Sequence, residues 1–166
     1  MTLAPVPAGP GIRRASWGGT TGFVITAIAA DVAPSTFEPA ALAVAVALFA
    51  AGCVAFVWAF LAMAARSRTE RMELGQVWFL AGTPTPPAVR RSLLGSLAVQ
   101  VVAGLATAAA RPYTSLAAGV LVPVFGMGLC GLWAARHATY PARPEANGRG
   151  PRGLPSGRAD QRDGNS

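Results

Sequence analysis

The sequence predicts an all-α membrane protein, a bundle of four transmembrane helices followed by a disordered cytoplasmic tail. Three observations predict this fold. Of the 166 residues, 52% are hydrophobic and only 13% are charged, whereas a soluble domain averages roughly 25% charged residues. Long uncharged segments follow one another along the chain, and the arginines gather between alternate pairs of these segments.

Three of the segments are free of charge and long enough to cross a bilayer, which takes about 20 apolar residues in a helix. They are residues 39–65, 92–110 and 112–135. We expect the corresponding membrane spans at about 40–66, 88–110 and 113–135.

The first apolar segment is shorter and contains three glycines, and we expect a span at about 16–33 with Asp31 in the headgroup region. A cleaved signal peptide is the alternative. Arg13 and Arg14 would be its basic region, residues 22–30 its apolar region and Ala27-Ile28-Ala29 its small-x-small cleavage site. Both interpretations place Asp31 outside, and the retained helix is the expectation.

The arginines define the orientation. Two precede the first span, five lie between the second and third, and six follow the fourth, so thirteen of the fourteen fall on one side. The positive-inside rule makes that side the cytoplasm, with both termini there. All basic residues are arginine, and Ala, Gly and Pro are abundant, which indicates a bacterial source and the plasma membrane. Topology accounts for the net charge of +7, so no nucleic-acid partner is expected.

These assignments divide the chain into a flexible N-terminus at 1–14, a transmembrane domain at 15–137 and a tail at 138–166. From Pro141 onward the tail is rich in arginine, glycine, proline, aspartate and asparagine. Such a composition cannot bury enough apolar surface to fold. We therefore expect the tail to be disordered.

Several residues inside the spans are candidates for helix packing or for a hinge. Gln100 lies midway along the third span, where its carboxamide can hydrogen-bond another helix. Pro123 would clash with the carbonyl of Gly119, and Gly126 follows, so we expect a kink there. A static kink that fits a neighbouring helix is favoured over a hinge. The second span has a row of alanines at every fourth residue, which predicts either close helix packing or an alanine-rich composition: Ala43, Ala47, Ala51, Ala55 and Ala59.

Residues 77–81 form a short apolar stub between the second and third spans, and Gly82 and three prolines follow it. It is too short to span. Trp78 and Phe79 suit the membrane interface, so we expect an interfacial loop that lies in the headgroup layer or plugs the end of the bundle. A docking surface for a partner subunit and a gate are the alternatives.

The sequence carries no motif for catalysis, a cofactor or a metal. Cys53 and Cys130 lie inside spans and are expected to act as small hydrophobic residues. His137 is the only histidine and has no second ligand in the sequence. On the outer face Arg111 can pair with Asp31 or with Glu38.

The second half of the chain resembles a family of small uncharacterised actinobacterial integral membrane proteins. The resemblance covers Arg90–Pro141 and includes the arginine pair before the third span, the "ARP" turn at Ala110–Pro112, the Pro/Gly-rich fourth span and the "GLWAARH" end. It implies a membrane location and no activity or site residues.

Three functional classes follow from these features. We expect a non-enzymatic integral membrane protein that packs with or assembles another membrane component, with the lipid bilayer and another membrane protein or a second copy of this chain as partners. A small oligomeric transporter is the alternative, although Asp31 lies nearer the membrane end than a transport carboxylate should. A membrane enzyme is least favoured because the acid, base and metal groups are missing.

Overall fold

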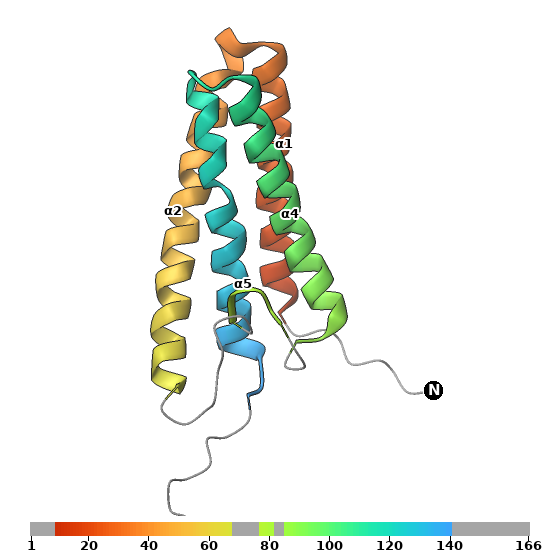
Figure 1. The fold of residues 1–166 in the computed structure, drawn as a ribbon, viewed down its shortest axis with the longest axis vertical. Coiled ribbons are helices and arrows are strands. Elements are labelled where there is room, and N and C mark those ends of the chain that lie inside the picture. Colours follow the sequence, from red (N-terminus) through yellow and green to blue (C-terminus); the bar gives the residue numbers. More distant parts are fainter. Residues whose placement is uncertain (1–8, 68–76, 82–84, 141–166) are drawn as a thin grey trace, which may run out of the picture.

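The computed structural model describes residues 9–67, 77–81 and 85–140, and these residues form helices without any strand (Figure 1). The elements are α1 (Pro10–Val32), α2 (Pro34–Arg66), α4 (Pro87–Ala110), the 3-10 helix η1 (Ser115–Leu121) and α5 (Pro123–His137). The all-α prediction is confirmed for this part of the chain. The tail from residue 141 onward lies outside the described residues.

Three helical segments are long and apolar enough to cross a membrane: α2, α4, and η1 together with α5. The observed bounds of α4 differ from the expected span by one residue. α1 begins at Pro10, so Arg13 and Arg14 are helical, whereas the sequence predicts a flexible N-terminus at 1–14. Proline at the first helical position is preorganised for a helix, which explains the early start.

Both turns at one end of the bundle are formed by a residue that precedes a proline. Ala33 alone connects α1 to α2, with φ −135° and ψ 73°. Arg111 ends α4 in nearly the same conformation, with φ −139° and ψ 67°. The ring of the following proline disfavours the helical region for the preceding residue. Pro34 and Pro112 therefore set where these two helices stop.

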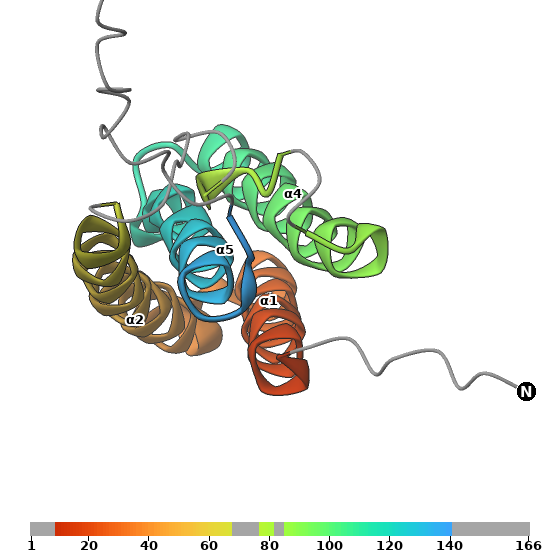
Figure 2. The same cartoon turned by 90° about the horizontal axis from the view of Figure 1, so that it is seen from below.

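The helices run up and down, and η1–α5 packs against both α2 and α4, while α1 packs against the same two helices (Figure 2). One end, here called the turn end, carries Asp31, Glu38 and Arg111. The opposite end, here called the basic end, carries Arg13, Arg14, Arg66, Arg90, Arg91 and Arg136. The charges of the described residues are thus separated along the bundle axis.

The closest approach between α2 and α5 occurs at two glycines. A Cβ added to Gly52 would lie 2.5 Å from the backbone nitrogen of Phe125, and one added to Gly128 would lie 2.6 Å from the carbonyl oxygen of Gly52. Real Cβ atoms do not approach that closely, so both positions require glycine at this crossing. Small residues allow such close contact between membrane helices.

The predicted alanine row of α2 does not form a single packing face. Ala59 is buried, but Ala43, Ala47 and Ala51 are exposed. With 3.6 residues per turn, a row at every fourth residue rotates by about 40° per step and leaves the interface. The observed buried face follows the true helical period instead, through Ala41, Ala45, Gly52, Ala59 and Met63.

Candidate functional site

The candidate site is a break in the last of the three segments that are long and apolar enough to cross a membrane. η1 ends at Leu121 and α5 starts at Pro123, which has no N–H group. Across the break the backbone continues with short-range bonds, from the Val122 N–H to the Gly119 carbonyl (3.1 Å) and from the Phe125 N–H to the Val122 carbonyl (2.9 Å). The N–H of Gly126 is the next donor along α5. It has no such backbone carbonyl to donate to, as is usual for N–H groups in the first turn of a helix.

Gln100 of α4 supplies the missing partner. Its Oε1 accepts a hydrogen bond from the Gly126 N–H at 3.1 Å, and its Nε2 donates to Thr20 Oγ1 of α1 at 2.7 Å. The side chain is fully buried. One carboxamide therefore connects three helices and caps the first turn of α5. In an apolar interior such a group must be paired, since an unpaired one costs several kcal/mol.

The two glycines named from the sequence make room for these contacts. A Cβ at Gly126 would lie 2.6 Å from Gln100 Oε1. A Cβ at Gly119 would lie 2.8 Å from Thr107 Oγ1 and 3.0 Å from the ring of Phe23. The structure thus brings Gln100, Gly126, Gly119 and the break at Pro123 into one region, where α1, α4 and η1–α5 meet.

Gln100 is also the last member of a polar row, here called the α1–α4 seam, which consists of Ser16, Thr20, Ser92, Ser96 and Gln100. Ser16 Oγ and Ser96 Oγ lie 2.5 Å apart, and Trp17 Nε1 donates to Ser92 Oγ at 3.1 Å. Thr20 Oγ1 also donates to the Ser16 carbonyl at 2.8 Å. Of these five residues, Gln100 alone is expected from the sequence to bond another helix. The four-residue spacing of the other members was the signal that could have identified them.

The interior around the break is closed and carries no charge within the described residues. Its cavity, lined by Phe23, Thr107, Gly119 and their neighbours, has a volume of about 10 Å³. That is room for about one water molecule. The buried polar side chains of α1 and α4 belong to Ser, Thr or Gln, and no three His, Cys, Asp or Glu residues in the described ranges could hold a metal ion.

The cysteines and the histidine take no part in the hydrogen bonds at the break. Cys53 is half-buried and Cys130 is buried, and neither forms a disulfide. His137 stacks on Trp133 with ring centroids 5.6 Å apart, and its Nδ1 is buried without a hydrogen-bond partner among the described residues.

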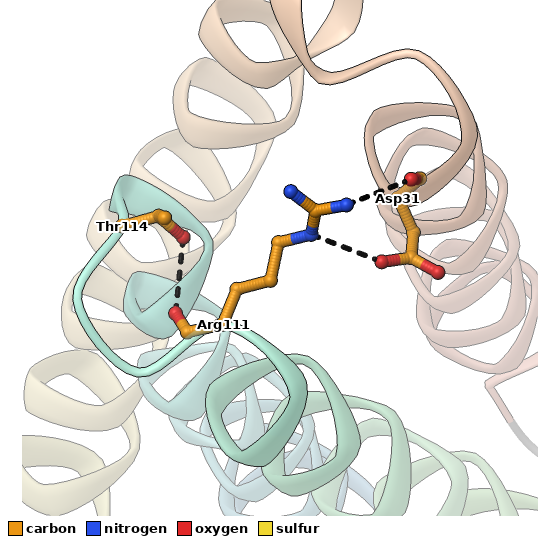
Figure 3. A network of polar contacts seen from close by, with 3 residues as sticks. All are labelled: Asp31, Arg111 and Thr114. Atoms are coloured by element: carbon orange, nitrogen blue, oxygen red, sulfur yellow. Dashed lines mark hydrogen bonds and ion pairs between the residues drawn. The ribbon is translucent and has the colours of Figure 1, made fainter.

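Arg111 and Asp31 form an ion pair at the turn end (Figure 3). Arg111 Nε lies 3.2 Å from Asp31 Oδ1, and Nη2 donates to the Asp31 carbonyl at 3.2 Å. The Arg111 and Asp31 side chains are 36% and 60% exposed, so solvent weakens the pair. Glu38 has a different role, because its Oε1 accepts hydrogen bonds from the backbone and hydroxyl of Ser115 at the start of η1.

The apolar stub plugs the basic end of the bundle. Val77 and Leu80 are buried, and Trp78 stacks on Phe56 of α2 with ring centroids 4.1 Å apart. A Cβ at Gly131 would lie 2.3 Å from the Trp78 ring, so this ring covers the glycine.

The two aromatic side chains of the stub differ in how far they are exposed. Phe56 lies about 15 Å along α2 from Arg66, and Trp78 is half-buried against it. Phe79 is 54% exposed. Of the two rings expected at the interface, Phe79 alone points outward.

Arg66 closes the same end by capping α5. Its Nη1 donates to the Ala135 carbonyl at 2.8 Å and its Nη2 to the Ala138 carbonyl at 3.1 Å. The guanidinium also lies over the Tyr140 ring, 5.5 Å from the centroid. A cation at a helix C-terminus satisfies its free carbonyls. The packed chain therefore reaches Tyr140, past the expected domain end at residue 137.

Comparisons with protein-family models, with curated proteins and with solved structures found no match. The function is therefore inferred from the geometry of the bundle. The break is filled by the chain's own side chain, the seam is paired with itself, and the aromatic stub occupies one end. The cavity at the break has no room for a substrate. A larger cavity of about 360 Å³ lies between α1 and α4 at the turn end, beside Asp31 and Arg111.

Proposed function

We propose that this chain is a four-span, non-enzymatic integral membrane protein of the bacterial plasma membrane that packs with another membrane component. Three of its helices have the length and composition of membrane spans. We infer that α1 is a retained fourth span because its buried polar side chains are paired with α4, as a helix in lipid requires. The resemblance of residues 90–141 to small actinobacterial membrane proteins points the same way.

We place both termini in the cytoplasm, and the concentration of arginine at the basic end supports this. Cysteine accessibility tests the orientation. In a background where Cys53 and Cys130 are alanine, Tyr113→Cys places a thiol at a fully exposed turn-end position, and Arg14→Cys places one at the basic end. An impermeant maleimide added to whole cells should label position 113 and not position 14. The reverse pattern would contradict the orientation.

The observation that carries the packing proposal is the contrast between the filled break and the outward face of α2. That face is entirely apolar over several turns, with the small residues Ala47 and Ala51 followed by the exposed Val54, Trp58 and Leu61. Small residues beside large ones form a groove and a ridge that a second helix can fit, and close packing drives association where hydrophobic burial does not.

Site-specific photocrosslinking tests this face. A photoreactive residue at position 47 or 51 should give a discrete adduct after irradiation of membranes, and the adduct's mass distinguishes a second copy of the chain from a different protein. Val102, which is exposed on α4, is the matched control position. Diffuse lipid adducts at all three positions would refute a specific contact on α2.

A small oligomeric transporter remains the alternative because a helix broken inside the bundle is typical of transporter sites. Gln100 occupies the break, and Asp31 is paired with Arg111 at the end of the bundle, so both features would have to rearrange during transport. Proton- or substrate-linked flux in liposomes that is lost in Asp31→Asn, at normal protein abundance, would favour this alternative over packing.

A further inference from the structure

The basic end contains a cavity that none of the packing described above uses. It has a volume of about 330 Å³ and is lined by Thr85, Pro87, Arg90, Arg91 and Leu94 at the start of α4. This volume is at the small end of the range of about 300–1,000 Å³ typical of ligand sites. Two cations, a hydroxyl and an apolar wall therefore surround one space.

Three groups around this cavity lack the partner that an anion would provide. Arg90 and Arg91 are exposed and make no hydrogen bond or ion pair with any residue the structure describes. Thr85 is 95% buried, with 5% of its surface exposed, and its Oγ1 has no hydrogen-bond partner in the described ranges. A buried hydroxyl without a partner destabilises the protein by about 1–3 kcal/mol.

The start of α4 adds to the positive field. No side chain caps this helix, and Pro86 and Pro87 have no N–H groups, so its first donor is the backbone of Ala88. The cavity lies beside the first two turns of α4, near the positive end of the helix dipole. Helix N-termini combined with arginines are typical binding sites for phosphate groups, because guanidinium groups match the geometry of phosphate oxygens.

We propose that this cavity binds a phosphate group, and that the phosphate belongs to an anionic lipid headgroup. Arg90 and Arg91 neutralise the phosphate, and the Thr85 hydroxyl donates to one of its oxygens. Leu94 and Pro87 form an apolar wall that a soluble anion would not use, whereas the glycerol and first methylenes of a lipid would cover it. The inference rests on the proposed membrane location, which is checked separately by whether the chain resists extraction by carbonate.

The test uses the full chain in a nonionic detergent and a fluorescent phosphatidylglycerol with its dye at the chain end, with binding followed by anisotropy. Arg90→Gln/Arg91→Gln should weaken binding about ten-fold or more, because each basic residue near anionic lipid contributes about 1 kcal/mol. The matched control is Arg14→Gln/Arg136→Gln, which removes two exposed charges from the same end. It should change affinity less than about three-fold, because neither residue lines the cavity and salt screens exposed charges that do not touch the ligand.

Thr85→Val gives an independent measurement that does not change charge. It should weaken phosphatidylglycerol binding about ten-fold or more, the loss of one hydrogen bond to a charged group. The same variant should be at least as stable as the native chain without lipid, since valine removes an unpartnered hydroxyl. A merely structural role of Thr85 would instead lower stability and leave affinity unchanged.

Other outcomes would overturn the proposal. Equal losses from the two arginine pairs would show nonspecific surface attraction only. Unchanged affinity in Thr85→Val would refute the assigned hydroxyl contact. Displacement of the lipid by inorganic phosphate in moderate excess would assign the site to a soluble anion and refute the lipid source.

Discussion

Replacing Gln100 by leucine should destabilise the bundle more than any other conservative change at a single polar residue of α4. Leucine has nearly the same volume, so the change removes two hydrogen bonds without opening a large cavity. The Gly126 N–H loses its acceptor in an apolar interior, which costs about 1–3 kcal/mol. The interhelical bond to Thr20 contributes about 0.6–1.7 kcal/mol. The free energy of unfolding should therefore fall by about 2–4 kcal/mol.

Unfolding by sodium dodecyl sulfate in mixed micelles, followed by the fluorescence of the four tryptophans, measures this quantity. Val102→Leu, on the exposed side of the same helix, is the control and should change stability by less than about 0.5 kcal/mol. A loss below about 0.5 kcal/mol for Gln100→Leu would refute the capping role. So would an equal loss in the control.

A double-mutant cycle assigns the effect to the break. Gly126→Ala should destabilise the native chain because its Cβ would lie 2.6 Å from Gln100 Oε1. In a Gln100→Ala background the same methyl group enters vacated space, so its effect should be smaller by about 1 kcal/mol or more. Equal effects in both backgrounds would show that the two residues do not share a contact.

Three further predictions concern the remaining contacts, each measured by the same unfolding assay. Gly52→Ala should lower the free energy of unfolding by about 1–3 kcal/mol because a Cβ has no room at the crossing. The control Gly22→Ala should be neutral or stabilising, because nothing lies within 4 Å of that position. Similar losses in the two variants would contradict the close crossing. Trp78→Ala should remove about 2–4 kcal/mol and Phe79→Ala less than about 1 kcal/mol, and the opposite order would show that the stub is rotated. Asp31→Asn should cost no more than about 1 kcal/mol, as expected for an exposed pair, and a larger loss would mean that this end is buried in the assembled protein.

The fold class and the places where helices stop could be predicted from sequence because they depend on local chemistry. Uncharged length identifies α2 and α4, and proline geometry sets both turns and the break at Pro123. Each of these signals involves neighbours in the chain and needs no knowledge of which helices meet.

The partners across helices could not be predicted, because rotation and register between helices leave no mark on one sequence. Thr26 and Thr107 resemble the seam residues in type and, like Thr20, donate to carbonyls of their own helices. Of these three, Thr20 alone also accepts a hydrogen bond from another helix. This local pairing is the usual one for hydroxyls within helices. Only the packed structure separates them from Ser16 and Thr20. For the same reason the sequence could not show that Trp78 faces inward while Phe79 faces outward.

The single-residue link at Ala33 restricts how the bundle can move. Adjacent Cα atoms are always about 3.8 Å apart, so α1 cannot slide along α2 like a piston by more than a fraction of a helical turn. Arg111 and Glu38 tie the neighbouring turn to the same end through their contacts with Asp31 and Ser115. The turn end therefore acts as a fixed pivot. Large relative motion of the helices is limited to tilting, which moves the helices apart at the basic end.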